Sequence, residues 1–163
     1  LLVGFNNVSY GKILINGQNL SEYNLNSLRE KIGYVTQDSY LFNGSVRYNI
    51  LLSENKKFDK EITHILRLFE LDNLFIENKI DLDKNIYDKA LNISGGQKQR
   101  LLIVRELLKK PDVIIFDETL SQLHKEIRLK IFEIIKSVRS EIIIINLTHN
   151  DEFKSISDKV LFI

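Results

Sequence analysis

The sequence has 163 residues, of which 44% are hydrophobic and 28% charged, so it fits one folded domain with a substantial core. Its formal net charge of +1 gives no strong field to attract nucleic acid or an anionic membrane, and the lack of cysteine excludes disulfides and thiolate metal sites. No apolar run reaches the ~18 residues of a membrane-spanning helix, and the start lacks the basic residues of a signal peptide.

The first third of the chain alternates turn signals with short apolar segments. Ile13–Ile15 predicts a strand that ends at the turn pair Asn16–Gly17. Lys31–Gln37 is rich in residues that favour extended backbone and predicts a second strand. Gly44–Ser45 then offers a cap for a helix over Val46–Leu52.

The middle of the chain predicts helices. Asp59 is a candidate cap for a helix with one apolar face, which comprises Ile62, Ile65, Leu66 and Phe69. The polar stretch Glu77–Asn92 predicts loop with some helix, and a further helix runs from Gln97 to about Lys110, where Pro111 stops it. Because residues 45–110 contain no convincing strand, we expect them to form a helical insertion.

The last third predicts two strands with a helix between them. Val113–Phe116 is a continuous apolar run, as expected of a strand covered on both faces. An apolar stripe from Ile127 to Val138 predicts the helix, and Ile142–Leu147 predicts a second, fully apolar strand. Buried strands joined by a helix favour a mostly parallel sheet with right-handed crossovers, so the predicted fold class is α/β.

A glycine loop at a helix start is the first candidate site. Ser94 and Gln97 have the spacing of a capping box, in which each side chain bonds the other residue's N–H group. Between them, Gly95 and Gly96 let the backbone approach a phosphate closely, and the helix dipole adds partial positive charge. The loop alone could be only a well-capped helix start. Two further features favour phosphate binding. The polar segment Lys98–Arg100 follows the loop directly, and the acidic pair Asp117–Glu118 follows a predicted strand further along the chain.

The acidic pair Asp117–Glu118 is the second candidate site, and it directly follows the Val113–Phe116 run. Neighbouring residues in an extended chain face opposite ways, so we expect the two carboxylates to have different functions. Asp117 is the candidate residue for Mg²⁺, acting through water because Mg²⁺ keeps much of its hydration. Glu118 is the candidate for orienting the attacking water and taking its proton. Two solvated carboxylates at a strand end are the alternative.

Four motifs, in this order along the chain, resemble those of the ATP-binding cassette (ABC) ATPases. Gln37 resembles the Q-loop glutamine, Ile93–Gln97 the LSGGQ signature, Phe116–Glu118 the end of the Walker B strand, and His149 the switch histidine. The resemblance covers essentially the whole chain. It implies a partial P-loop NTPase fold, with a mostly parallel sheet flanked by helices and a helical subdomain inserted.

The resemblance also implies cofactors and residue roles. The cofactors are ATP and Mg²⁺, with Asp117 and Gln37 at the metal. The catalytic residues are Glu118, His149 and Gln37. The signature residues contact the γ-phosphate of an ATP held by a second domain, and therefore act in trans; they are Ser94, Gly95, Gly96 and Gln97.

The P-loop that precedes these motifs in the family, G-x-x-x-x-G-K-[ST], is absent. The resemblance places Leu1–Gly4 in the helix that follows the P-loop, and Asp158–Ile163 inside a further strand. We therefore interpret the sequence as a nucleotide-binding domain cut at both ends. Residues from about 45 to 110 would be its helical, signature-bearing subdomain, and the remainder its RecA-like α/β core. Such a fragment is expected to bind and hydrolyse little ATP by itself and to be marginally stable.

The segments Asn24–Arg29 and Gln37–Val46 look like those of exporter members of the family. They imply an ATPase that powers transmembrane transport from the cytoplasmic face of a membrane. Its partners would be a second nucleotide-binding domain, identical or different, and the transmembrane domain of the exporter, with no nucleic acid. Two alternatives remain: a non-catalytic partner cassette that lends its signature loop, or a soluble ABC ATPase acting on DNA or ribosomes.

Some residues depart from the family's pattern. The D-loop, usually Ser-Ala-Leu-Asp, here places Gln122 and His124 at its second and fourth positions. Asp88 stands before the signature where exporters usually have Glu. We expect these changes to affect communication between two nucleotide sites more than hydrolysis itself, and they leave a degenerate site open. His64 and His124 show no metal-binding spacing with His149.

Overall fold

The computed structural model describes residues 1–71, 81–87, 93–149 and 151–161. Its centre is a parallel sheet of three strands in the order β3, β6, β7, so the predicted parallel α/β arrangement is confirmed. The strands comprise β3 (Ile32–Thr36), β6 (Val113–Asp117) and β7 (Ile143–Leu147). Their last residues, Thr36, Asp117 and Leu147, are register partners, so all three strands end at the same edge.

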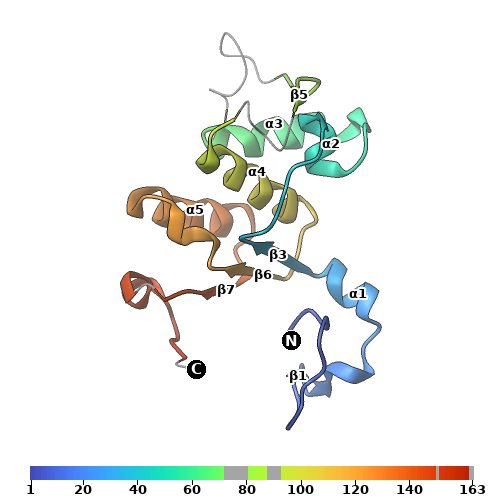
Figure 1. Cartoon of the computed structure of the whole chain (residues 1–163), viewed down its shortest axis with the longest axis vertical. Coiled ribbons are helices and arrows are strands. Elements are labelled where there is room, and N and C mark those ends of the chain that lie inside the picture. Colours follow the sequence, from blue (N-terminus) through green and yellow to red (C-terminus); the bar gives the residue numbers. More distant parts are fainter. Residues whose placement is uncertain (72–80, 88–92, 150, 162–163) are drawn as a thin grey trace.

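The sheet separates two hydrophobic clusters. Figure 1 shows helices α2 to α5 grouped on one side of it and the N-terminal segment with β1 on the other. Ile114 and Phe116 of β6 face the helices, whereas Ile115 belongs to the cluster on the N-terminal side. All three side chains are buried, which confirms the prediction that this strand is covered on both faces.

The N-terminal segment forms a turn and a small ribbon. The ribbon pairs β1 (Leu14–Ile15) with β2 (Gln18–Asn19) around Asn16–Gly17, where both turn residues have positive φ. The 3-10 helix η1 (Leu20–Glu22) and helix α1 (Leu25–Glu30) follow.

The expectation that Leu1–Gly4 is helical was wrong. The N–H of Gly4 bonds the carbonyl oxygen of Leu1 at 2.9 Å, closing a turn, and Gly4 has a φ of +68° that ends any right-handed helix. Arg29 of α1 takes the free carbonyl groups instead: its Nε bonds Val3 at 3.0 Å and its Nη2 bonds Gly4 at 3.1 Å.

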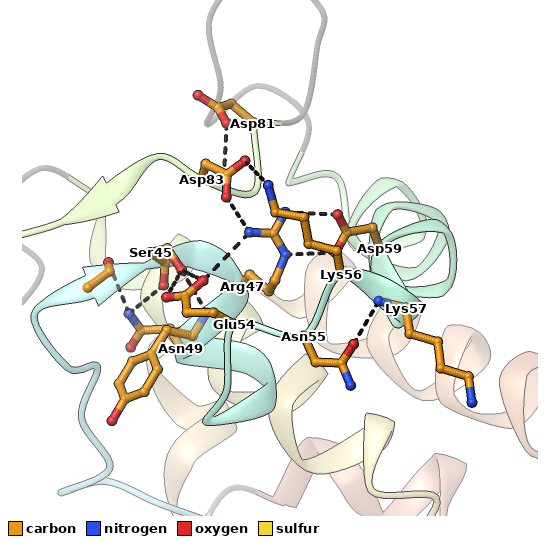
Figure 2. A network of polar contacts seen from close by, with 12 residues as sticks. Ser45, Arg47, Asn49, Glu54, Asn55, Lys56, Lys57, Asp59, Asp81 and Asp83 are labelled. Carbon is orange, nitrogen blue, oxygen red and sulfur yellow. Dashed lines mark hydrogen bonds and ion pairs between the residues drawn. The ribbon is translucent and has the colours of Figure 1, made fainter.

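Helices α2 (Val46–Leu51), α3 (Asp59–Leu68) and α4 (Gly95–Leu108) lie where helices were predicted, and η2 (Lys56–Phe58) leads into α3. Ser45 caps α2 by accepting a hydrogen bond from the N–H of Tyr48 at 2.8 Å. Asp59 does not cap α3, contrary to expectation. Its carboxylate binds the buried guanidinium of Arg47 instead, because that cation needs charged partners once it is removed from water (Figure 2).

Residues 45–110 were expected to contain no convincing strand, and the structure shows a short two-residue pairing there. β4 (Gly44–Ser45) pairs with β5 (Asn85–Ile86) in antiparallel register. The contact continues into the first turn of α2, where the N–H groups of Val46 and Arg47 bond the carbonyl groups of Lys84 and Leu82, each at 2.9 Å. These N–H groups have no partner inside their own helix, so residues 82–86 serve as a backbone cap for α2.

The predicted loop Glu77–Asn92 is described in part. Of the stretch Glu77–Asn92, residues 81–87 are described and form a turn and β5 rather than a helix. Residues 77–80 and 88–92, with Asp88 among them, lie outside the described residues.

Of the two strands predicted near the end of the chain, the one over Ile142–Leu147 is confirmed as β7, and the one over residues 158–163 is not found in its described part. β7 lies at the edge of the described sheet rather than in its interior, and Ile143 is 59% exposed. The polar Asn146 interrupts the apolar run, and its buried side-chain amide has no hydrogen-bond partner among the described residues. Residues 158–161 are irregular and exposed, because none of the described strands lies beside them to complete a ladder, while residues 162–163 lie outside the described part.

Helix α5 (Lys125–Val138) follows β6 through η5 (Thr119–Gln122), and η6 (Asp151–Ile156) follows β7. None of the helices in the described ranges is both long enough and apolar enough to cross a membrane.

His124 occupies the cap position of α5 but makes no side-chain capping bond. We expect His124→Asp to stabilise the protein by about 1 kcal/mol, because aspartate accepts bonds from the first N–H groups and its charge favours the helix N-terminus. Thermal unfolding should show a midpoint roughly 2–4 °C higher. The same change at His64, an exposed residue inside α3, should give no gain, because aspartate has no capping role in a helix interior.

Candidate functional site

Polar side chains follow the carboxyl ends of all three parallel strands. Gln37 directly follows β3. Asp117 is the last residue of β6 and Glu118 follows it, and His149 comes two residues after β7. We call these four residues the carboxyl edge. Ligands of open parallel sheets bind beyond the carboxyl ends of the strands, so this edge is the candidate site.

Asp117 is held by a tyrosine of the neighbouring strand. The hydroxyl of Tyr34 donates a hydrogen bond to Oδ2 of Asp117 over 2.7 Å. This bond, together with burial and the negative charge of Asp117, raises the pKa of Tyr34 to about 12. The Tyr34 hydroxyl therefore stays a protonated donor throughout the physiological pH range.

Glu118 leaves the strand and turns toward the next one. Its backbone is left-handed, with a φ of 54°, and its N–H bonds the carbonyl oxygen of Leu147 at 3.0 Å. Its Oε1 lies 3.0 Å from Nε2 of His149, and the two side chains are 48% and 94% exposed. Asp117 and Glu118 thus contact different partners, but the left-handed bend at Glu118, rather than strand alternation, separates them.

Gln37 lies exposed in the turn after β3. Ser39 closes this turn: its N–H bonds the carbonyl oxygen of Thr36 at 3.1 Å, and its hydroxyl accepts from the N–H of Thr36 at 3.0 Å. Because Thr36 is the register partner of Asp117, the turn places Gln37 just beyond the acidic pair. The structure brings Glu118 and His149 into direct contact and leaves Gln37 open to solvent.

The predicted capping box at the start of α4 is confirmed. The N–H of Gln97 bonds Oγ of Ser94 at 3.3 Å, and the N–H of Ser94 bonds Oε1 of Gln97 at 2.8 Å. Ser94 is exposed, not buried in the core. The first helical N–H groups therefore face solvent, where an anion can reach them.

The two glycines of this loop have no role in the fold that the structure shows. A Cβ at Gly95 would meet nothing within 4 Å, and one at Gly96 would make an ordinary contact of 3.5 Å with Leu123. Both residues are helical, so neither needs the conformational freedom of glycine. Glycine is a poorer helix former than alanine, by up to about 1 kcal/mol in a helix interior. This cost, without a packing reason, fits a surface that something must approach closely.

The loop lies at the same end of the fold as the carboxyl edge. Gly96 lies near Leu123, which follows Glu118 by five residues. Helix α4 leads from this loop to the start of β6, and β6 then returns to the carboxyl edge. The structure therefore places the two candidate sites at one end of the fold.

Sequence reasoning missed Tyr34 as part of the site. Tyr34 and Asp117 share a face because Tyr34 pairs with Ile115, two residues before Asp117. The available signal was that Tyr34 lies two residues before the end of β3, so that it shares a face with the last residue of that strand. This spacing points to Asp117 only once the register of β3 against β6 is known.

Comparison with known proteins gives this architecture a family. The pattern of the ABC transporter family matches residues 1–121. An export ATP-binding/permease protein of Rickettsia typhi, so named provisionally, is 33% identical over 163 residues, which are 100% of this chain and 28% of that protein. The heterocyst differentiation ATP-binding protein HepA of Nostoc is 32% identical over 161 residues, covering 99% of this chain and 26% of HepA.

A solved structure agrees with these relatives. A chain in the structure of a bacterial Atm1-family ABC exporter with ATP bound matches with a TM-score of 0.80 and 30% sequence identity, over 96% of this chain and 27% of that chain. The fold is thus that of an ABC ATPase domain, as predicted. The chain belongs to the ABC transporter family. It spans about a quarter of the length of the relatives it matches.

Proposed function

We propose that this chain is part of the nucleotide-binding domain of an ABC exporter, and that the complete domain binds and hydrolyses ATP to power transport across a membrane. The observation that carries the proposal is the contact of 3.0 Å between Glu118 and His149 at the carboxyl edge of the sheet. In this assignment Glu118 orients the attacking water and accepts its proton, and His149 donates a hydrogen bond to the terminal phosphate. Gln37 contacts the water and the metal.

The residues present fit a magnesium ion held jointly with a nucleotide. In the described ranges, no three His, Cys, Asp or Glu side chains gather into a metal site of their own. Mg²⁺ is typically bound by one or two carboxylates together with phosphate oxygens and water, and Asp117 with Gln37 would supply such a partial set. When bound, the ion would neutralise charge on the phosphates.

The remaining assignments concern partners. Ser94, Gly95, Gly96 and Gln97 would contact the γ-phosphate of an ATP held by a second nucleotide-binding domain. Residues from about 45 to 110 would form the helical subdomain, and the rest the α/β core. The transmembrane domain of the exporter would place the domain at the cytoplasmic face of a membrane. The exposed Ser94 cap and the open space at Gly95 support the assignment of the loop.

A non-catalytic partner cassette is the second candidate function. His124 favours it, since this residue replaces the usual D-loop aspartate and leaves α5 without a side-chain cap. Such a cassette would keep the Ser94 loop for its partner while its own carboxyl edge turned over no ATP.

The loop assignment is tested by Gly95→Ala in the complete protein. We expect ATP turnover to fall at least about tenfold, because the added methyl group obstructs a phosphate approaching the backbone. Thermal stability should stay equal or rise by about 0.5 kcal/mol, because alanine is the better helix former and its Cβ meets nothing. A variant that is stabilised and keeps full turnover would remove the loop from the nucleotide site, whereas a folding defect would lower both quantities.

A further inference from the structure

We propose that Tyr34 is a positioning residue for the carboxylate of Asp117, and that it sets the affinity of this site for a divalent cation. The inference deepens the proposed function and rests on it, because Asp117 must be the residue at the metal. It differs from the assignments above in that Tyr34 belongs to none of the four motifs that the sequence shares with the family.

The hydrogen bond between the two residues fixes one carboxylate oxygen only. Tyr34 donates to Oδ2 of Asp117 at 2.7 Å, a length typical of a bond from a hydroxyl group to a charged acceptor. The other oxygen, Oδ1, is left to bind the metal or one of its water molecules. An Asp side chain at a strand end can otherwise rotate, and Mg²⁺ tolerates little deviation from octahedral geometry.

Tyr34 is itself held in place from several directions. Its ring is partly buried against the hydrophobic cluster that contains Ile32 and Ile115, and its N–H bonds Oε2 of Glu106 at 3.3 Å. The ring of Phe5 lies 6.3 Å from that of Tyr34, and the guanidinium of Arg29 lies 5.0 Å over Phe5. The phenol is therefore a fixed donor rather than a side chain that searches for a partner.

A fixed donor of this kind affects the metal without touching it. Groups that orient a ligand raise affinity by reducing the rearrangement needed for binding, and their loss typically costs about 10- to 100-fold. Because the Asp117 carboxylate remains at the edge of the sheet without Tyr34, we expect the lower end of this range.

The test uses the complete protein, Mn²⁺ as a probe for the cation site, and a non-hydrolysable ATP analogue to prevent turnover. Tyr34→Phe removes the hydroxyl and keeps the ring. We expect Mn²⁺ affinity, measured by electron paramagnetic resonance in the presence of the analogue, to fall about tenfold. Affinity for the analogue in excess EDTA should be unchanged, since the hydroxyl acts only through the carboxylate.

Tyr23→Phe is the matched control. The hydroxyl of Tyr23 also donates a bond of 2.7 Å, but to the carbonyl oxygen of Ile15, in the N-terminal ribbon. This change should leave Mn²⁺ affinity unaltered. An equal loss of Mn²⁺ affinity in both variants would overturn the proposal, because the effect would then come from a general loss of structure.

A third variant separates this inference from the proposed function. Asp117→Asn should weaken Mn²⁺ binding by itself, and adding Tyr34→Phe to it should cause no further loss, because the two residues act through one carboxylate. If Asp117→Asn has no effect, the proposed metal role of Asp117 fails. If Asp117→Asn weakens binding but Tyr34→Phe leaves the affinity unchanged or raises it, only the positioning role of Tyr34 is overturned.

Discussion

Glu118→Gln is expected to lower ATP turnover by the complete protein by about 10²- to 10⁴-fold, the usual contribution of a group that transfers a proton in the transition state. Glutamine has the size of glutamate and can still place an oxygen near Nε2 of His149. It cannot accept the proton of the attacking water. Nucleotide affinity should therefore stay within about threefold, because the change removes chemistry and not the binding surface.

The measurement is steady-state phosphate release together with equilibrium nucleotide binding. Glu133→Gln makes the same chemical change on the exposed face of α5 and should leave both quantities unaltered. Turnover that survives in Glu118→Gln would favour the non-catalytic partner cassette, since hydrolysis would then take place at another domain's site. Loss of nucleotide binding together with turnover would instead point to misfolding of the edge.

The exposure of Glu118 and His149 bears on this test. With side chains 48% and 94% exposed, their contact is open to solvent and screened by it. A base that is this exposed is not made more effective by removal from water. Most of its effect must come from holding a water molecule in line with the phosphate, which requires the left-handed bend at Glu118 to be kept.

The parallel sheet could be predicted because its signals are local. Val113–Phe116 is apolar without interruption, and this pattern alone indicates a strand covered on both sides. The edge position of β7 could not be predicted, because Ile143 and its neighbours are as apolar as a buried strand. Which strands have two neighbours is decided by topology, and one segment's composition carries no information about it.

The residues of the candidate site could be proposed from the sequence, but not their arrangement. The motif resemblance proposed Gln37, Asp117, Glu118 and His149, and all four lie at or just beyond the carboxyl ends of the strands. The contact of Tyr34 with Asp117 depends on the register between two strands about 80 residues apart in sequence, a feature set by packing on both faces.

The helical region shows the opposite problem, in which a local signal was misleading. Asp59 stands at a helix start and satisfies the composition rule for a cap. The rule failed because a long-range partner competes for its carboxylate. β5 was missed for a related reason: its neighbours are polar, and its segment pairs with β4 and the first turn of α2, which lie far away in the sequence.

Arg47, which binds the carboxylate of Asp59, joins three segments of the chain (Figure 2). Its side chain is 3% exposed, yet its guanidinium binds both carboxylate oxygens of Asp59, at 2.7 and 2.8 Å. It also bonds Oδ1 of Asp83 beside β5 and lies 3.6 Å from Oε2 of Glu54. These bonds hold the pKa of Asp59 and that of Asp83 below their usual values. The cation thus links α2 to α3 and to the segment that caps α2.

Arg47→Ala is expected to lower the local stability of α2 and β5 by about 2–3 kcal/mol, chiefly through loss of the paired bonds to Asp59. Asp59 and Asp83 keep some access to water, so the cost stays below the roughly 3–5 kcal/mol of a fully buried pair. Amide hydrogen exchange in the complete protein should accelerate roughly 30- to 150-fold in these two elements. Arg67→Ala, which removes an exposed arginine of α3, should change exchange by less than about threefold.

The pH dependence of this effect separates ion pairing from packing. Because Arg47 depresses the pKa of Asp59 and Asp83, the stabilisation is complete above their unfolded-state pKa of about 4 and is lost as the pH falls through the lower folded-state values. Between about pH 5 and pH 3 the native protein should therefore lose local stability, whereas Arg47→Ala, which has no such pairs, should lose less. The two exchange profiles, corrected for intrinsic rates, should converge toward low pH. A gap of constant size across this range would show that the variant's defect is a packing cavity under α2, since a cavity carries no proton to titrate.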